Sequence, residues 1–465
     1  MALFSLLLGA TCLLYILCTN PVHGLGRFLA PDTMVIVTMF SIFSIRPLFE
    51  DRFEIRTIYG IVPDAASIDA AILVGIVFMT SFTIAVFLNR IRPQSHKRLI
   101  SLDEHLDRRE LRITASKTVM TALAAFAVYL ATLTILSGPA VFARLAAGRS
   151  SDAGLGGVPE IVMILPMAGS ICAALFILSR RKNAITRKEW LILSAAPLIS
   201  VMALSQLGNR RFLIPAILIP VVVALIRKPV RVKFSHIAAA IVAFLMLAII
   251  PMVRSAGARI KGEGLLEASW RYFQSEGLQG VLTPVFASYD TEMLDYIAII
   301  SHPLGNAIPY GFGRGTVLEF LLRPLPSGIS GEPAYSDVVL TAVWGGGCGT
   351  PVCPVASTAG VLYFEGGLAF VAFGAFLFGI LAARLTNAWK YNQHVSTIKL
   401  TTVSVASAFA LVATRTNTVH AIWWSLYAVF LCMFMYWFFS RPLKIHHKGS
   451  RGNTLAVVVK DGIKI

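Results

Sequence analysis

The chain carries little charge. Only 14% of its 465 residues are Asp, Glu, Lys or Arg, whereas soluble domains carry roughly 25%. Hydrophobic residues make up 56% of the chain, and the mean hydropathy is +0.72. Several apolar runs approach the ~20 residues that a helix needs to cross a bilayer, and the core of a soluble protein cannot account for so many. We therefore expect an integral membrane protein.

The sequence also lacks the common motifs of nucleotide and metal chemistry. It has no Walker A loop, no dinucleotide fingerprint, no HExxH and no GxSxG. The fragment "GFGRG" (311–315) has neither the context nor the spacing of a nucleotide loop. We therefore expect no cofactor and no metal. The net charge of +17 does not indicate nucleic acid, because most basic residues fall in short connections, where they report membrane topology.

Cysteine is scarce, with six residues. Cys348 and Cys353 share the Gly-rich stretch "GGGCGTPVCP", where a disulfide and two free thiols are both open. The other four lie inside apolar runs and are expected to be small core residues: Cys12, Cys18, Cys172 and Cys432.

No basic residue precedes the apolar N-terminal stretch "MALFSLLLGATCLLYILC", as one would in a cleaved signal peptide, so we expect a retained first span. Eleven runs have the length and composition of spans: 2–18, 31–48, 68–89, 117–137, 158–179, 189–206, 211–227, 235–253, 356–383, 399–414 and 419–439.

Lys and Arg concentrate on alternate connections, among them 89–112, 179–188 and 227–233, and in the tail. By the positive-inside rule these segments are cytoplasmic, which places the N-terminus outside and the C-terminus inside. The predicted fold is an all-α polytopic membrane protein with about eleven transmembrane helices and one large extracytoplasmic loop. Its parts are a bundle of about eight helices (1–253), the loop (254–355), about three C-terminal helices (356–440) and a basic tail (441–465).

The large loop shows helical patterning. "LLEASWRYF" (265–273) places Leu266, Trp270 and Phe273 at helical spacing, which suits an amphipathic helix on the membrane. "DTEMLDYIAII" (290–300) is a second candidate, with Asp290 able to cap its N-terminus.

Arginines gather on the predicted outer face. Arg210 and Arg211 occupy a six-residue gap between two apolar runs, and Arg314, Arg323 and Arg415 share their side of the membrane. Arginine presents a planar fork of donors that matches phosphate oxygens, which lysine cannot do. This pattern indicates a phosphate-bearing ligand such as a lipid-linked diphosphate. The alternative is that these side chains extend to lipid headgroups or pair with carboxylates of the loop.

A second tight outer hairpin, "ATRTNTVHAIWW", should end one helix near Arg415 and restart the next near Val419. Its polar residues, Asn417 among them, can hydrogen-bond a sugar or phosphate. His420 could act as a general base, and the alternative is a hydrogen-bonded interfacial histidine without a catalytic role.

Acidic residues of the outer face are the other candidate bases, and the sequence does not choose among them. We take Asp290, Glu292 and Glu332 as the candidates beside His420. The whole outer set comprises Glu50, Asp51, Glu54, Asp290, Glu292, Asp295, Glu319, Glu332, Asp337 and Glu365.

Three stretches together resemble the oligosaccharide repeat-unit polymerases, or O-antigen polymerases, of bacterial envelopes. They are "LGNRRFLIP", "IPYGFGRGTVLEFLLRPLPSGISGEP" and "PVASTAGVLYFEGGLAFVAFG". The chain departs from the family pattern at Glu332, where the family often has lysine, and before the motif tyrosine, Tyr363, where a carboxylate is often found.

The resemblance implies a transferase of the bacterial inner membrane that uses undecaprenyl-diphosphate-linked glycans at the periplasmic face. It implies that Arg210, Arg211 and Arg323 bind the diphosphate, supported by Arg314 and Arg415. Asn417, Tyr363 and Trp270 are the candidate glycan contacts. Expected partners are the lipid-linked oligosaccharide, membrane lipids and a chain-length regulator protein, with no nucleic acid. An O-antigen ligase, a polyprenyl-monophosphate-dependent glycosyltransferase and a transporter are the alternatives.

Overall fold

The structure is a computed structural model, and the statements below concern the residues it describes. These are 1–48, 61, 63–91, 109–111, 113–138, 160–180, 185–205, 210–227, 230–231, 233, 270–271, 273–275, 277, 293–323, 335–344, 356–390 and 397–442.

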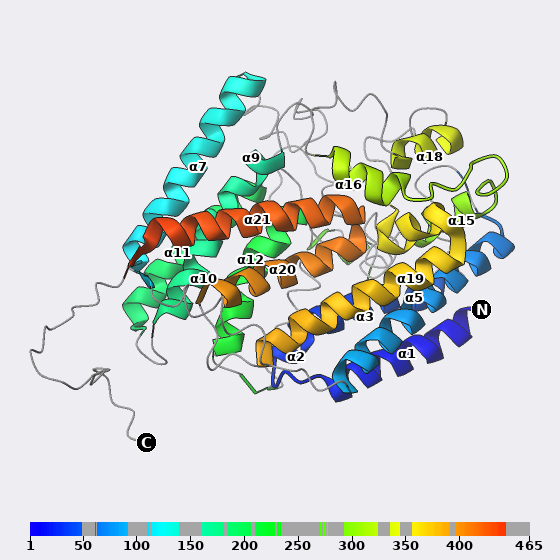
Figure 1. The fold of residues 1–465 in the computed structure, drawn as a ribbon, viewed down its shortest axis with the longest axis horizontal. Helices are drawn as coiled ribbons and strands as arrows, with labels where there is room; N and C mark the ends of the chain where they lie inside the picture. The colour runs from blue at the N-terminus through cyan, green and yellow to red at the C-terminus, as the bar shows by residue number, and fades with distance from the viewer. Residues whose placement is uncertain are drawn as a thin grey trace, which may run out of the picture.

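The described residues are almost entirely helical, which confirms the predicted fold class in its coarse form (Figure 1). In the first part of the chain the elements are α1 (Ala2–Thr19), α2 (Gly26–Leu29), α3 (Pro31–Phe40), the π-helix η1 (Ser41–Ile45), α5 (Ala65–Ile91), α7 (Ala115–Ser137), α9 (Glu160–Ile164), the 3-10 turn η5 (Leu165–Met167), α10 (Ala168–Ser179), α11 (Arg187–Ser205) and α12 (Arg210–Arg227). They continue with α15 (Met293–Ser301), the π-helix η6 (Arg314–Leu318), α16 (Glu319–Leu322), α18 (Tyr335–Trp344), α19 (Ser357–Lys390), α20 (Thr397–Arg415) and α21 (Thr418–Phe439). Two short strands, β1 (Arg109–Leu111) and β2 (Ser440–Pro442), pair antiparallel.

Seven helices of the described residues are long and apolar enough to cross a membrane: α1, α5, α7, the stretch Ile161–Ser179 that contains α10, α19, α20 and α21. α12 is apolar but shorter. The run expected to span at 31–48 forms the ten-residue α3 followed by η1. α11 covers the run at 189–206, and the run at 235–253 lies outside the described residues.

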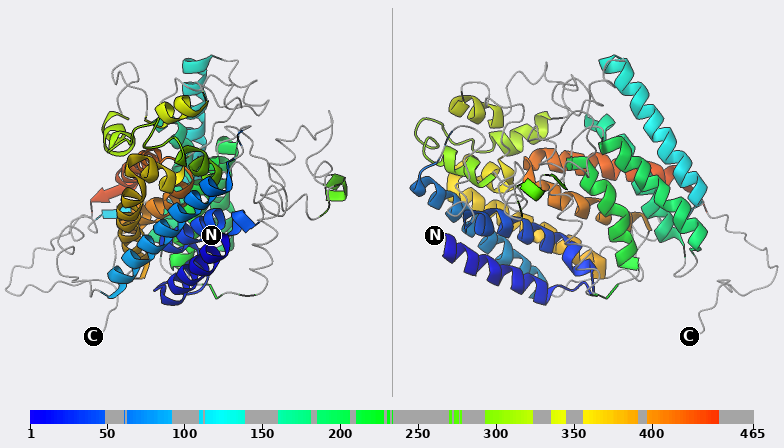
Figure 2. Two further views of the ribbon diagram at one scale, coloured as in Figure 1. Left: turned by 90° about the vertical axis from the view of Figure 1, so that its right-hand side faces the viewer. Right: turned by 180° about the vertical axis from the view of Figure 1, so that it is seen from behind.

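The helices form two groups, each around its own apolar core (Figures 1 and 2). The first group contains α1, α3, α5, α15, α18 and α19. The second contains α7, α10, α11, α12 and α21. α20 lies between them, because it packs against α12 and α21 on one side and against α3 and α19 on the other. Three cysteines, Cys12, Cys172 and Cys432, are buried as expected, whereas Cys18 is exposed. Cys348 and Cys353 lie outside the described residues.

α19 is the principal partner of α5, and a glycine permits their close approach. A Cβ atom on Gly379 would lie 2.6 Å from the carbonyl oxygen of Phe82. Small residues at such contacts let two helix backbones meet, which is how helices commonly associate in lipid. Nearer its start, α19 is interrupted at Gly366 and Gly367, and Gly367 has a φ of 67° that favours glycine. The first two turns of α19 therefore take a direction of their own.

α15 differs from the sequence prediction. A helix is present within 290–300, but it is not amphipathic, because every side chain from Met293 to Ile300 is buried. The one charge in it, Asp295, forms a buried ion pair with Arg46. That pairing allows the helix to enter the first group rather than lie on the surface, since a buried charge needs a partner.

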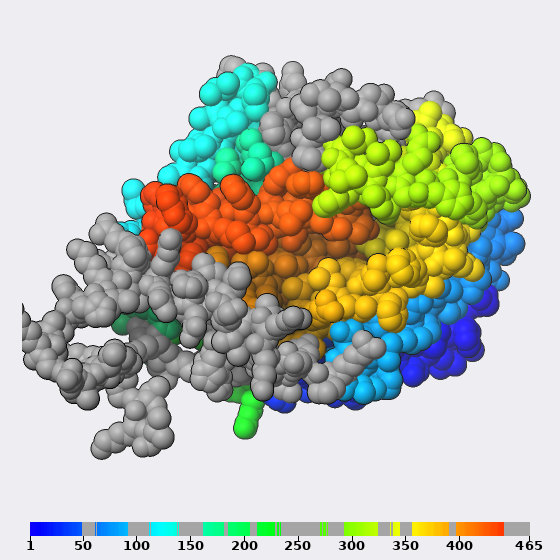
Figure 3. Space-filling model, viewed as in Figure 1, coloured from blue at the N-terminus to red at the C-terminus, as the bar shows by residue number. Residues whose placement is uncertain are grey.

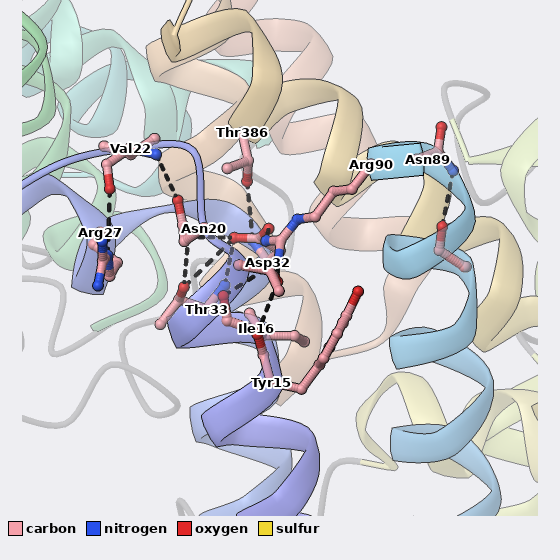
Figure 4. A network of polar contacts seen from close by, with 12 residues as sticks. Tyr15, Ile16, Asn20, Val22, Arg27, Asp32, Thr33, Asn89, Arg90 and Thr386 are labelled. Carbon is pink, nitrogen blue, oxygen red and sulfur yellow. Dashed lines mark hydrogen bonds and ion pairs between the residues drawn. The ribbon is translucent and has the colours of Figure 1, made fainter. Parts of the chain in front are cut away.

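A polar network ties together the ends of α1, α3, α5 and α19 (Figure 4). Asp32 is completely buried, and its Oδ2 lies 2.5 Å from Nη2 of Arg90. The side-chain amide of Asn20 donates to Oδ1 of Asp32 over 3.2 Å and to Thr33 over 3.0 Å. The backbone N–H of Asp32 donates to Thr386 over 3.4 Å. The network fixes the relative heights of four helices at this end of the bundle.

Other contacts join segments at the same end. β1 pairs with β2 there, and the N–H of Leu25 donates to the carbonyl of Val230 over 2.9 Å. The opposite ends of the helices gather the Arg46–Asp295 pair and the α20–α21 hairpin. The described chain therefore has two distinct polar ends separated by apolar helices.

The Asp32–Arg90 pair gives a test of this packing. Asp32→Asn keeps the shape of the side chain but leaves the guanidinium of Arg90 largely buried without a counter-charge. Breaking a buried pair in this way costs about 3–5 kcal/mol, so the melting temperature in detergent micelles should fall by many degrees.

Asp69→Asn is the matched control. Asp69 is exposed, and its Oδ1 forms a loose ion pair with the N-terminal amine at 3.8 Å. Exposed pairs of this kind contribute about 0–1 kcal/mol. Equal melting temperatures for the two variants would contradict the structural role of the network.

Candidate functional site

Glu319 is a buried carboxylate at the hairpin end of the bundle that contacts three polar side chains. It opens α16 and is only 7% exposed. Three side chains approach its Oε1 atom: Nδ2 of Asn417 donates to it over 3.2 Å, Nε2 of His420 lies at 3.2 Å, and Nη1 of Arg323 lies at 4.0 Å. Arg323 follows Glu319 by one helical turn, whereas the other two residues come from about 100 positions later in the chain.

The two oxygens of Glu319 differ. Oε1 receives all three of these partners, whereas Oε2 is buried and accepts no hydrogen bond from the described residues. A buried acceptor with no donor is costly, by about 1–3 kcal/mol or more when it is charged. Such an atom in a native fold calls for an explanation, and a ligand that donates a proton is one.

The α20–α21 hairpin supplies the partners, and its predicted limits are confirmed. α20 ends at Arg415 and α21 begins at Thr418. Asn417 is the N-cap of α21: its Oδ1 accepts the N–H of Val419 over 3.0 Å while its amide nitrogen donates to Glu319. Both sides of one amide are therefore used, and the start of α21 is fixed by the same residue that orients the carboxylate.

Aromatic contacts hold α16 against α21. The ring of Phe320 stacks on Trp423 with centroids 5.1 Å apart. Nε1 of Trp423 also donates to the carbonyl of Phe320 over 2.9 Å. One turn earlier on α21, His420 is 5.8 Å from the ring of Trp424. These contacts pack the segment that carries Glu319 against the helix that carries His420.

A second buried carboxylate, Glu365, lies at the interruption of α19. Its Oε2 accepts the N–H of Gly313, and its backbone carbonyl accepts the N–H of Phe312 over 2.9 Å. The carbonyl of Phe364 likewise accepts the N–H of Gly311 over 3.0 Å. The "GFGRG" stretch is thus held on α19, directly before the helix that carries Glu319.

Tyr335 completes this region. Its hydroxyl donates to the carbonyl of Pro309, and the guanidinium of Arg314 lies 5.9 Å from its ring centre. Burial, followed by the nearby Glu365 carboxylate, raises the pKa of Tyr335, while Arg314 acts in the opposite direction. The phenol is therefore a hydrogen-bond donor rather than an anion at neutral pH.

The arginine pair of the short hairpin lies at the start of α12. Arg210 and Arg211 are its first residues, and only their backbone is described. The next residue, Phe212, makes an edge contact with Trp424 at 4.9 Å, and Trp424 contacts His420. The backbone of the pair is thus at the same end of the bundle as Glu319.

The structure brings together part of the predicted site. His420, Asn417 and Arg323 converge on one carboxylate. Arg415 is the last residue of α20, directly before the hairpin. On the other side of the hairpin, the hydroxyl of Thr418 donates to the hydroxyl of Thr358, at the start of α19, over 3.1 Å.

The other predicted residues are separate from that carboxylate or fall outside the description. Tyr363 is on α19, two residues before Glu365, and no described contact joins it to Glu319. Trp270 is exposed and stacks on Phe273 at 5.9 Å, in the short green segment that lies apart from the bundle in the left view of Figure 2. The remaining candidates, Asp290, Glu292 and Glu332, lie outside the described residues.

Glu319 belongs to the outer acidic set, and the sequence gives no decisive reason to prefer it as the base. A local signal existed: it is the only charge in "GTVLEFLL", and Arg323 stands at i+4. No spacing, however, connects it with a histidine 101 positions away.

Within the described part of the chain, no group of three His, Cys, Asp or Glu side chains has the arrangement of a metal site. The chemistry available here is that of a carboxylate, an imidazole, an amide and several guanidinium groups.

Comparisons with known proteins add no assignment, since no family model, no curated protein and no solved structure matches the chain.

The double use of Asn417 can be tested with two substitutions that both preserve an N-cap. Asn417→Ser removes the donor to Glu319, whereas Asn417→Asp replaces it with a second carboxylate. Two adjacent carboxylates raise the pKa of one of them in the folded state. The Asp variant should therefore match the Ser variant at low pH and become less stable as the pH rises through that pKa.

Melting temperatures of the two variants across pH 4 to 8 provide the measurement. A difference between them that does not change with pH would show that residue 417 and Glu319 are not coupled.

Proposed function

We propose that the protein is a membrane glycosyltransferase that polymerises undecaprenyl-diphosphate-linked oligosaccharide repeat units. The proposal joins the resemblance to O-antigen polymerases with the arrangement around Glu319. The reaction would take place at the outer face of the bacterial inner membrane. Its product would be a surface polysaccharide.

The supporting observation is the Oε2 atom of Glu319. It is buried, it accepts no hydrogen bond from the described residues, and the other oxygen of the same carboxylate is held by Asn417, His420 and Arg323. A general base needs an acceptor atom within hydrogen-bond reach of the proton it removes, and side chains that prevent its rotation. We assign the base to Glu319 and treat His420 as a positioning residue, in place of the earlier candidates His420, Asp290, Glu292 and Glu332.

In the proposed reaction, a hydroxyl group of the incoming repeat unit attacks the anomeric carbon of the growing chain. The bond from that carbon to the diphosphate breaks, and its electron pair leaves on the diphosphate oxygen. The hydroxyl proton passes to Oε2 of Glu319. The products are a chain longer by one repeat unit and free undecaprenyl diphosphate, so atoms and charge balance.

The arginines would stabilise the leaving group. Negative charge grows on the diphosphate as the bond breaks, and preorganised guanidinium groups are suited to it. Arg210 and Arg211 begin a helix at this end of the bundle, while Arg323 and Arg314 flank the segment that carries Glu319. Arg415, the last residue of the neighbouring helix α20, would support them.

The proposed topology retains eleven spans with the Glu319 end outside. Support comes from the opposite end, where the paired strands β1 and β2 adjoin the Lys- and Arg-rich segments 89–112 and 441–465. The partners remain those implied by the family resemblance, namely the lipid-linked oligosaccharide, membrane lipids and a chain-length regulator.

Glu319→Gln tests the assignment of the base. It keeps the shape and most hydrogen bonds but removes the acceptor charge, so kcat should fall about 10²–10⁴-fold with the protein still inserted. His420→Gln should reduce the rate less, because it only loosens the carboxylate. The assay uses purified protein with a defined undecaprenyl-diphosphate repeat unit and measures laddered products.

Glu189→Gln is the control, since Glu189 is half-buried and lies at the start of α11, at the other end of the helices. Full activity in Glu319→Gln would reject the proposed base. Ladders are expected of a polymerase, whereas a deletion strain that accumulates long polymer on the lipid carrier would identify a ligase instead.

The arginine pair gives an independent prediction. Replacing Arg210 and Arg211 by alanine should abolish polymer while preserving membrane insertion, because the leaving diphosphate loses its positive partners. Arg187→Ala, at the start of α11, is the control for loss of an arginine at a helix end. Normal chain length in the double variant would overturn the assignment of the pair.

A further inference from the structure

The segment that carries Glu319 has an inverted distribution of polarity. From Phe312 to Leu322 the chain forms a turn, η6 and α16. Its outward side chains include Phe312, Val317 and Leu321, which are 73%, 64% and 62% exposed. Its inward side carries the carboxylate of Glu319. Arg314, at the start of η6, is the exposed charge of this segment. A helix in water places its apolar face inward, whereas the exposed face after Arg314 is apolar and lies opposite the buried carboxylate, so water does not explain this arrangement.

The outward apolar face is as exposed as the lipid-facing side of a span. Phe373, on the outer side of α19, is 64% exposed, the same as Val317. Large contiguous apolar surface of this kind marks a membrane or protein contact rather than a solvated face.

The surface is also continuous with the spans. The ring of Phe312 meets Phe370 of α19 edge-on at 6.3 Å, and Phe320 stacks on Trp423 of α21. Figure 3 shows residues 293–323, in yellow-green, lying directly against the surfaces of α19 and α21. The apolar face thus extends an existing lipid-facing surface instead of forming an isolated patch.

Phe312 gives a second, independent observation. It has a φ of 44°, in the left-handed region where residues other than glycine are rare. This conformation costs free energy, and the hydrogen bond from the Phe312 N–H to the carbonyl of Glu365 holds it in place. The backbone is thus held in a strained form that directs a large aromatic ring outward, against Tyr310 and Phe370.

Trp423 supports the same conclusion. Its indole N–H is bonded to the carbonyl of Phe320, at the end of α21 where the helix begins. Tryptophan is enriched where spans meet the headgroups, because its ring is apolar at one side and polar at the other. A tryptophan with this contact at a helix end is what the membrane interface favours.

We propose that residues 312–322 lie in the bilayer leaflet at this end of the protein, with Phe312, Val317 and Leu321 against lipid acyl chains. Glu319, on the opposite side of the same helix, then faces the protein at headgroup depth. A lipid-anchored ligand reaches the Glu319 region sideways from the leaflet, without leaving the membrane. The proposal needs only that the protein is embedded in a bilayer, and it stands whether or not the glycosyltransferase assignment is correct.

The test measures the depth of single side chains. In a variant with all six cysteines replaced, cysteine is introduced at Leu321 or Val317, labelled with the environment-sensitive fluorophore NBD and reconstituted into liposomes. Phe373→Cys on α19 is the control for contact with lipid. Asn306→Cys, in an exposed polar turn at the same end, is the control for water.

Emission from Leu321 and Val317 should be blue-shifted and quenched by lipids brominated on their acyl chains, to an extent close to that at Phe373. Emission at Asn306 should be unaffected. Emission at Leu321 that is quenched by iodide in the water, or by neither agent, would show that water or a protein partner covers the face, and either result overturns the proposal.

A second measurement keeps the native cysteines, in case the cysteine-free protein does not fold. Photoreactive p-benzoylphenylalanine at Phe312 replaces one aromatic side chain by another. Irradiation in liposomes should add the mass of a phospholipid, as the same residue at Phe373 does, whereas its placement at Asn306 should not. Absence of the lipid adduct at Phe312, with the adduct present at Phe373, would refute the placement.

Discussion

A carboxylate removed from water costs several kcal/mol unless charges or hydrogen bonds replace its hydration. The structure around Glu319 is organised by this requirement. Three donors meet at one of its oxygens, and they come from α16 and from the α20–α21 hairpin. Two of them, Asn417 and His420, lie at the N-cap and in the first turn of α21, at the hairpin. The hairpin, the position of α16 and the orientation of the carboxylate are therefore one structural unit.

The same requirement is met at three other places, each between segments distant in the chain. Asp32 pairs with Arg90, Asp295 pairs with Arg46, and Glu365 accepts the N–H of Gly313. Between these points the helices pack largely through apolar residues, with close backbone approach at Gly379. The polar pairs thus specify which helix ends meet and at what height, while the apolar surface supplies most of the contact area.

Composition was sufficient to predict the helical fold and several helices long and apolar enough to cross a membrane, because the apolar runs are long and nearly free of charge. The hairpin limits followed from "TRTNTVH", whose polar residues cannot continue an apolar helix. The burial of α15 did not follow, since its environment depends on Arg46, about 250 positions away. For the same reason His420 and Asn417 were identified as candidates, but the carboxylate that they hold was not selected. Local patterns report which residues need partners, and the tertiary fold decides which partner each one receives.

The sequence separation of Glu319 and its partners has a consequence for biosynthesis. Chains emerge from the ribosome N-terminus first, so α16 is complete about 100 residues before the asparagine and histidine that hold its carboxylate exist. During that interval, Arg323 is the only one of the three side chains around Oε1 of Glu319 that has been made. Closure of this end of the bundle must therefore wait for α21, the last helix among the described residues. A chain interrupted before Thr418 would contain the other span-length helices but neither α21 nor the His420 that contacts Glu319.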